Sequence, residues 1–264
     1  MLDDAQTREA ADLLWTCWND GSRIATLPET VRPNSRAEGY AIQATLESRE
    51  DAPLYGWKIA ATSAAGQGHI GVDGPLAGRL LASRAYEDGA EVPFGANGMA
   101  VAEPEFAFRL GTDLPPRDVA YDVVEVLAAV ESLHPAIEIP DARFDDYAAA
   151  GGPQLIADNA CAHQFVLGTA APPSWREIDL VTHHVGGMVS SGLMRDGEGA
   201  NVLGDPRIAL TWLASELSSL GLTLKAGQVI TTGTCMVPLE VAPGDGVKAD
   251  FGAIGSATVR FAET

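Results

Sequence analysis

Two glutamates on either side of one proline stand in an otherwise apolar run, Glu103-Pro104-Glu105-Phe106-Ala107-Phe108. Side chains alternate along a β-strand, so Glu103 and Glu105 share one face of the strand. Two carboxylates this close repel each other, and removing them from water adds to the cost. A divalent cation relieves both penalties. The pair therefore indicates a metal site, whereas on a solvent-exposed face it would be two ordinary surface glutamates.

A third glutamate, Glu138, lies inside the apolar run 136–139, which reads Ala-Ile-Glu-Ile. A charged side chain within an apolar strand usually has a partner. Together, Glu103, Glu105 and Glu138 predict a three-carboxylate site for a hard cation, Mg²⁺ or Mn²⁺.

Two further residues are candidates for acid/base chemistry. Lys58 is the one charged residue of the run 56–63, and a buried lysine needs a partner or loses its proton. We expect it either to bind an anionic carboxylate and move protons, or to extend to solvent from a strand edge. Asp73 lies in the turn 71–75, which either delivers it to the same site or uses it to bond its own backbone.

Four more residues are candidate substrate ligands. Asp158 and Asn159 stand between apolar residues, where they either organise a turn or support the metal ligands and substrate. Thr232 and Gly233 lie where an apolar strand ends, and backbone N–H groups there can hold a carboxylate in a small nest. A plain strand-to-turn transition is the alternative.

Several other kinds of site are excluded by their absent motifs. The sequence has neither the glycine-rich signatures of nucleotide binding nor the GxSxG element of serine hydrolases. His183 and His184 are adjacent, so they do not readily face one metal. We interpret them as an ordinary strand pair, and His69, His134 and His163 as structural.

Charge and cysteine content narrow the function further. The 264 residues include 17 basic and 36 acidic residues, which gives a net charge of −19. Such a surface excludes nucleic-acid partners and repels anionic membranes. Three scattered cysteines, no secretion signal and no apolar run of membrane-spanning length predict a cytoplasmic protein.

The expected architecture is α+β, with an N-terminal helical lobe over 1–52 and a β-rich core over 53–264. Capping residues and apolar spacing predict helices over 4–20, after Ser35, over 119–132 and from Asp205 to Gly221. We expect strands over 54–61, 99–110, 136–139, 165–168, 178–186, 228–232 and 257–261, between turns rich in glycine and proline.

Many short motifs occur in one order along the chain: Gly56–Ser63, Gly71–Pro75, Glu103–Glu105, 136–139 followed by Asp141-Ala142-Arg143, Ala157–Ala160, Val202–Pro206, Trp212–Ala214, Leu224–Gly227 and Pro243–Asp245. With this set, the chain resembles the 2-keto-4-pentenoate hydratase and 4-oxalocrotonate decarboxylase branch of the fumarylacetoacetate hydrolase superfamily. The resemblance runs from Leu54 to Phe261.

The resemblance implies a mixed β-roll core, a homo-oligomer that associates with a pathway enzyme, and a small anionic 2-oxo or 2-hydroxy acid substrate. It implies Mg²⁺ or Mn²⁺ on Glu103, Glu105 and Glu138, with Lys58 in the pocket. The leading hypothesis is a metal-dependent hydratase that adds water to a 2-hydroxy-2,4-dienoate from aromatic meta-cleavage. The product is then a 4-hydroxy-2-oxo acid.

Three alternatives stay open: a decarboxylase of a 2-oxo diacid, a C–C bond hydrolase and a non-catalytic partner subunit. A diacid needs a second cationic contact, for which Arg143 and Arg79 are candidates. The sequence departs from the family pattern at Cys161, at Trp57 and over 139–143, which leaves the substrate undetermined. We expect Trp57, Phe106 and Leu203 to line the space for the substrate's tail.

Overall fold

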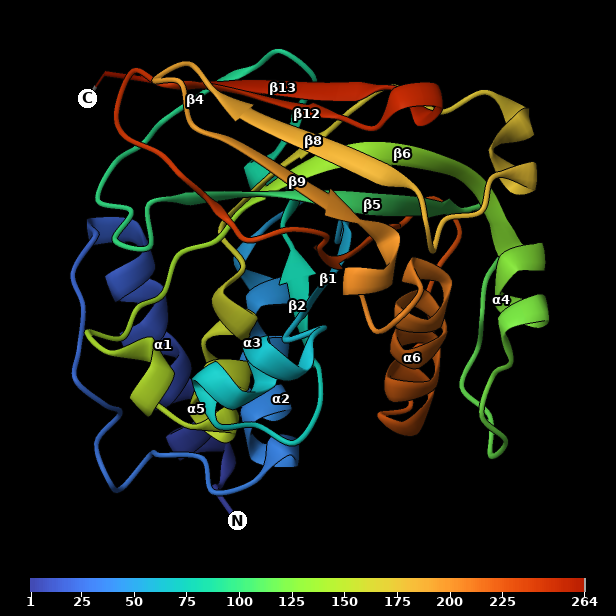
Figure 1. Cartoon of the computed structure of the whole chain (residues 1–264). Coiled ribbons are helices and arrows are strands. Elements are labelled where there is room, and N and C mark those ends of the chain that lie inside the picture. The colour runs from blue at the N-terminus through green and yellow to red at the C-terminus, as the bar shows by residue number, and fades with distance from the viewer. Residues whose placement is uncertain (264) are drawn as a thin grey trace.

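The computed structural model describes residues 1–263, in which two β-sheets lie one above the other and the helices gather below them (Figure 1). The larger sheet has the order β2-β1-β10-β5-β6-β7-β3, with β11 beside β5; its strands are β1 (Gly56–Ala60), β2 (Leu76–Leu80), β3 (Ala85–Glu87), β5 (Val101–Leu110), β6 (Val130–Ile139), β7 (Gln164–Leu167), β10 (Val229–Thr234) and β11 (Leu239–Glu240). The smaller sheet has the order β4-β13-β12-β8-β9, formed by β4 (Glu91–Val92), β8 (His184–Val189), β9 (Met194–Glu198), β12 (Gly246–Asp250) and β13 (Ser256–Phe261).

The helices are α1 (Asp4–Asp20), α2 (Arg36–Ala44), α3 (Ala64–Ile70), α4 (Val123–Ala129), α5 (Gly152–Ala157) and α6 (Pro206–Ser219). Short 3₁₀ turns join them, among them η3 (Tyr147–Ala149) and η4 (Asn159–Cys161). Within residues 1–263, no helix combines the length and the apolar character that a membrane crossing needs.

One apolar core holds the two sheets together. Phe106 on β5 meets Phe251, which follows β12, edge-to-face with ring centroids 5.0 Å apart. Both rings are completely buried, and such a side chain contributes about 1.5–3 kcal/mol when it leaves water. This packing keeps β5 and β6, which carry the predicted carboxylates, rigid in the middle of the molecule.

The N-terminal helices form where their caps predict them. The Asp3 carboxylate accepts the N–H groups of Ala5 and Gln6 at the start of α1, and Gly21 ends the helix with φ 75°. Figure 1 shows α1 and α2 in one group with α3 and α5, next to the end of the larger sheet that β1 and β2 form. The mixed β core with an N-terminal helical lobe is confirmed, and α5 from the middle of the chain joins this group of helices.

Two predicted elements are wrong in extent. The helix expected over 119–132 exists only as α4, because β6 begins at Val130 and pairs with β5 along its whole length. The strand expected over 178–186 begins only at His184, because the Asp179 side chain accepts the N–H of Val181 and the hydroxyl of Thr182 in a local turn. Helix α3, with two glycines and no clear apolar stripe, is not predicted by the sequence pattern.

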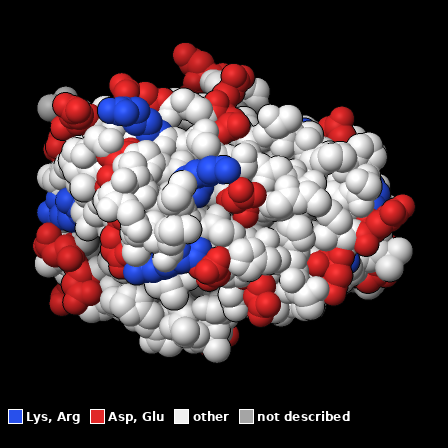
Figure 2. Space-filling model, turned by 45° about the horizontal axis from the view of Figure 1, so that its top comes forward, with Lys and Arg blue, Asp and Glu red and all other residues white. Residues whose placement is uncertain are grey.

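The surface reflects the acidic composition. On the face in Figure 2, acidic side chains are scattered over the surface and along its margins, and basic ones occur in only a few places.

Candidate metal centre and active site

The pairing of β5 with β6 brings the three predicted carboxylates together. Glu103 lies opposite Glu138 in the register, and Glu105 follows two residues along the same face of β5. One carboxylate oxygen from each residue lies within 4.8 Å of the others. Glu105 and Glu138 are completely buried, whereas Glu103 is partly exposed.

Within residues 1–263, three oxygens of this cluster accept no hydrogen bond, and two of them, Glu105 Oε1 and Glu138 Oε2, also have no ion-pair partner. Glu105 Oε2 accepts the Thr231 hydroxyl at 2.5 Å and the Gly233 N–H at 2.7 Å. Glu105 Oε1 and Glu138 Oε2 are buried without a hydrogen bond. Unpartnered buried carboxylate oxygens are costly, and hard cations bind such oxygens. The cluster therefore fits a resident cation, and its donors are those that Mg²⁺ and Mn²⁺ prefer.

Lys58 on β1 supplies the one positive charge at the cluster. Its Nζ lies 2.9 Å from Glu138 Oε1 in an ion pair whose angles are outside hydrogen-bond geometry, and it donates to the Ala160 carbonyl at 3.0 Å. Three carboxylates and one ammonium sum to a charge of −2. A divalent cation would bring this buried group of charges to zero.

The pKa values express the same imbalance. Burial raises the pKa of Glu103 to about 7, with Glu138 adding to the shift and Lys58 opposing it. Burial, together with the other two carboxylates, raises the pKa of Glu105 well above its usual value, and burial also raises that of Glu138. Burial acts to lower the pKa of Lys58, but the three carboxylates outweigh it and the pKa is raised.

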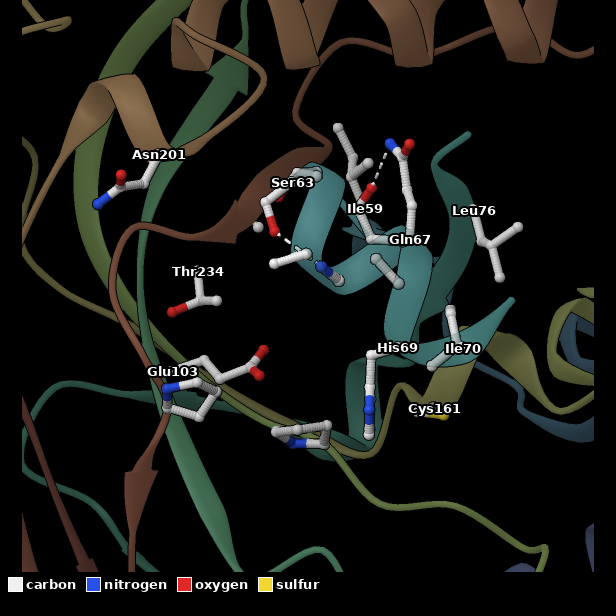
Figure 3. Close-up of a pocket in the computed structure, with 18 of the residues that line it drawn as sticks. Ile59, Ser63, Gln67, His69, Ile70, Leu76, Glu103, Cys161, Asn201 and Thr234 are labelled. Atoms are coloured by element: carbon white, nitrogen blue, oxygen red, sulfur yellow. Dashed lines mark hydrogen bonds between the residues drawn. The ribbon is translucent and has the colours of Figure 1, made fainter. Parts of the chain in front are cut away.

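A cavity of about 1070 Å³ opens over Lys58 and Glu103. In Figure 3, Glu103, Thr234 and Asn201 lie on one side of it and the residues of α3 on the other. Its polar lining also includes Ser63, Gln67, His69, Tyr147 and Asp196, and its apolar lining includes Ile70, Leu76, Met99, Val101, Leu155 and Leu203. A small acid in this cavity would thus have the carboxylates at one end and largely apolar side chains around the rest of it.

His69, which the sequence indicates as structural, lines this cavity. It lies on α3, and its Nε2 is 3.3 Å from the Tyr147 hydroxyl on η3. On the same helix, Gln67 donates to the Ala61 carbonyl. These contacts hold α3 over the cavity. The sequence pattern does not predict this helix.

Asp73 does not reach the cavity. It is exposed in the turn between α3 and β2, and it is not among the residues that line the site. The turn directs its carboxylate to solvent, so the structure does not bring Asp73 together with Lys58 and the three glutamates.

Asp158 and Asn159, the expected substrate ligands, are buried beneath the cavity lining and are each bonded to an arginine. Asp158 is ion-paired with Arg143 and accepts the Arg143 N–H at 2.9 Å. Asn159 Oδ1 accepts the Arg79 N–H at 2.6 Å, and its Nδ2 donates to the Arg79 carbonyl at 2.8 Å. The guanidinium of Arg79 bonds Glu47, so neither arginine offers a cation to the cavity.

The turn at Gly233 organises the metal site more than a substrate. Thr232 is buried and donates its hydroxyl to the Phe106 carbonyl at 2.9 Å. Gly233 lines the cavity, but its N–H is used by Glu105. Of the three expected tail residues, only Leu203 lines the cavity; Trp57 and Phe106 are buried elsewhere in the core.

The comparisons with known proteins agree with this geometry. Residues 59–262 match the family described as fumarylacetoacetate (FAA) hydrolase C-terminal. This chain belongs to that family. It is 33% identical over 265 residues to a 2-keto-4-pentenoate hydratase of Paraburkholderia xenovorans, a match that covers 97% of this chain and 95% of the relative. It is 34% identical over 214 residues to a 2-hydroxyhexa-2,4-dienoate hydratase of Comamonas testosteroni, covering 80% and 79% of the two chains.

A solved structure extends the likeness to the whole fold. The 4-oxalocrotonate decarboxylase of Pseudomonas putida G7, complexed with magnesium and adipate, superposes with a TM-score of 0.89 at 26% identity over 99% of each chain. The family membership places this chain among enzymes. The curated relatives above are hydro-lyases, and this chain is an enzyme of that class.

Proposed function

We propose that this chain is a metal-dependent hydratase that converts a 2-hydroxy-2,4-dienoate into a 4-hydroxy-2-oxo acid. The observation that carries the proposal is the buried cluster Glu103, Glu105 and Glu138, with two unpartnered oxygens and Lys58 beside it, at the base of an apolar cavity. The hydratase names of the curated relatives support the same reaction.

In this proposal Glu103, Glu105 and Glu138 hold Mg²⁺ or Mn²⁺. When bound, the cation supplies positive charge that stabilises the enolate of a 2-oxo acid. Thr231 and Gly233 hold one oxygen of Glu105 and leave the other directed at the cluster. Their role is to orient a ligand, which is how partners of metal ligands commonly act.

Lys58 is the residue that we assign to the substrate. Its ammonium lies at the boundary between the carboxylates and the cavity, where it can anchor the substrate carboxylate or move a proton to and from the dienoate carbon chain. Asp73, the other residue considered for this step, lies in solvent outside the cavity.

The lining of the cavity favours a substrate with one carboxylate. Among residues 1–263, Lys58 is the only lysine or arginine that lines it, and the lining also carries the acidic Asp196. A second carboxylate at the far end of a diacid would meet mostly apolar side chains such as Leu76 and Leu155. Burying that charge without a partner is unfavourable.

A decarboxylase of a 2-oxo diacid is the second candidate, since the solved structure named for that activity superposes over nearly the whole chain. Arg79 and Arg143, which were candidates for the second carboxylate, are both used by acidic side chains below the cavity. A C–C bond hydrolase and a non-catalytic subunit remain as outcomes of the experiment. A homo-oligomer, alone or with a pathway enzyme, is a further proposal that sedimentation velocity tests.

The test is to follow the ultraviolet absorbance of 2-hydroxypenta-2,4-dienoate with purified protein and Mg²⁺, with and without a chelator. Absorbance loss that the chelator abolishes, with a 4-hydroxy-2-oxo acid as product, supports the hydratase. No loss, together with CO₂ release from a 2-oxo-hexenedioate, supports the decarboxylase. Metal binding without turnover of either compound leaves the C–C bond hydrolase and the non-catalytic subunit.

A further inference from the structure

Three consecutive residues at the wall of the cavity, of which Ala160 and Cys161 line it, have the left-handed backbone conformation. The φ angles of Asn159, Ala160 and Cys161 are 55°, 51° and 61°. Residues other than glycine rarely adopt this conformation, and each costs free energy that the surrounding structure has to supply. Asn159 and Ala160 are also almost completely buried. Such a turn persists only where neighbouring groups hold it.

The turn directs one carbonyl at the catalytic lysine. Lys58 Nζ donates to the Ala160 carbonyl at 3.0 Å, and its other close partner is Glu138. Glu138 is also a predicted metal ligand, so its oxygens are shared between the ammonium and a cation. A buried ammonium needs an acceptor of its own. The Ala160 carbonyl supplies an acceptor that no cation competes for.

The side chain of Asn159 holds the turn against β2. Its amide bonds both the N–H and the carbonyl of Arg79, at 2.6 and 2.8 Å. Because β2 is the end strand of the sheet, the N–H and the carbonyl of Arg79 face away from β1 and are free to bond the Asn159 amide. The Asn159 amide thus makes the two hydrogen bonds that a neighbouring strand would make with β2.

Gly78 completes the arrangement, because it lies opposite Lys58 in the register of β1 and β2. A Cβ atom at this position would lie 2.4 Å from the Asn159 carbonyl oxygen and 3.0 Å from Lys58 Cγ. The absence of a side chain lets the lysine stem and the turn pack against the same point of β2. The turn at Asn159 and the stem of Lys58 therefore both pack against β2 at Gly78.

We propose that Asn159 is a positioning residue: it holds the left-handed turn so that the Ala160 carbonyl fixes the Lys58 ammonium beside the carboxylate cluster. The proposal rests on the function proposed above, because it assigns a task to Lys58 in turnover. Its structural part, the place of the ammonium, is independent of which reaction the enzyme catalyses.

The experiment compares Asn159→Ala and Asn159→Gly with Gln43→Ala. Gln43 is a matched control because it is completely buried and its Nε2 donates to the Ala77 and Ile156 carbonyls at 2.8 and 2.9 Å. It thereby joins α2 to the same strand and to α5, and its Oε1 accepts from the Arg79 guanidinium, but it bonds none of the three turn residues 159–161. Asn159→Gly is included because glycine adopts the left-handed conformation without strain, which preserves the fold.

We expect both Asn159 variants to lose about 10- to 100-fold in kcat, as for a misplaced catalytic group, with KM and Mg²⁺ affinity nearly unchanged. In crystal structures of the Asn159 variants, Lys58 Nζ should lie outside hydrogen-bond distance of the Ala160 carbonyl. Gln43→Ala should lower Tm by a similar amount and leave kcat within about twofold of the unmodified enzyme.

The proposal is overturned if Lys58 keeps its bond to Ala160 in Asn159→Gly, or if Gln43→Ala loses as much kcat as the Asn159 variants. If the unmodified enzyme turns over no dienoate, the proposed function fails. The Nζ-to-carbonyl distance in the variants then still decides whether Asn159 positions the lysine.

Discussion

Among single residues, the three carboxylates of the site carry more negative charge than Lys58 balances. Glu105 is held by two donors on one oxygen and has none on the other, and Glu138 is shared with one lysine. The raised pKa values of all three carboxyls have burial as their first cause and mutual repulsion as a further cause at Glu103 and Glu105. A cation of charge +2 is the group that balances them.

Replacing Glu105 by Gln tests this balance directly. The glutamine carbonyl can still accept from Thr231 and Gly233, so the fold should be kept, but the cluster loses a charged ligand. We expect Mg²⁺ affinity, measured by calorimetry, to fall about 100-fold or more, since even partners of ligands matter 10- to 100-fold. Tm of the metal-free variant should equal or exceed that of the unmodified protein, because repulsion is reduced.

Glu131→Gln is the matched control, because Glu131 is exposed on the same strand as Glu138. It should leave Mg²⁺ affinity unchanged. Equal affinity losses in Glu105→Gln and Glu131→Gln would contradict the assignment of the cluster as the metal site.

Stabilisation by metal should depend on pH. In the metal-free protein the pKa of Glu103 is about 7, against 4.5 in an ordinary carboxyl. Between these values the native state binds a proton that the unfolded chain releases, so this carboxyl makes the free energy of unfolding fall as pH rises. A bound cation requires the ionised form and removes this loss.

We therefore expect the increase in Tm on adding Mg²⁺ to grow as pH rises from about 5 to about 7. Taking the difference with and without Mg²⁺ cancels groups outside the cluster such as His163, whose pKa burial lowers to about 3. A Tm increase that is the same at every pH would count against ionisation of the cluster on metal binding.

At the scale of elements, the site depends on an irregularity in β10. The pairing of β10 with β5 shifts register between Thr231 and Thr234, and this shift directs the Gly233 N–H to Glu105. Gly233 has φ 98°, and a Cβ atom there would lie 2.0 Å from Thr62 Oγ1. The orientation of the Glu105 carboxylate thus depends on the register shift in β10 and on the glycine at position 233.

Gly233→Ala should damage this structure, and Gly192→Ala provides its control. Gly192 also has a positive φ, 102°, but a Cβ atom there meets nothing within 4 Å. We expect Gly233→Ala to lower the free energy of unfolding by about 1–3 kcal/mol more than Gly192→Ala, because it also overpacks the site. Denaturant unfolding measures both, and equal losses would show that the contact with Thr62 does not matter.

The sequence predicts those parts of the fold that local chemistry determines. The apolar spacing over 4–20 and Gly21 after it place α1, and the alternation of Glu103 and Glu105 places both carboxylates on one face. The start of β6 at Val130 is not predictable in this way, because an apolar stretch suits a helix as well as a strand until β5 pairs with it.

The candidate site shows the same division. The carboxylates and Lys58 are recognisable because a charge within an apolar strand is unusual. The directions of Asp73 and Asn159 are not, because both lie in turns whose side chains can face solvent, backbone or cavity. The place of His69 beside the cavity is not predictable either, because His69 lies on α3. This helix is short and contains two glycines, so the sequence pattern does not indicate it.

At the scale of the whole molecule, an acidic enzyme has to attract an acidic substrate. The net charge of −19 repels an anion over long range, while Lys58 and a bound cation attract it only at the site. Raising NaCl from about 20 to about 200 mM should therefore lower KM for the dienoate by about twofold, because salt screens the repulsion. Steady-state kinetics at saturating Mg²⁺ measures this, and a KM that rises with salt would contradict it.

The central claim is that turnover requires a divalent cation on the three glutamates. Metal-free protein is titrated with Mn²⁺ while bound metal and the loss of 2-hydroxypenta-2,4-dienoate absorbance are measured on the same samples. We predict that the rate rises in proportion to the bound metal, reaches its maximum at one cation per chain, and is abolished in Glu105→Gln. Undiminished turnover by metal-free protein in the presence of a chelator would contradict it.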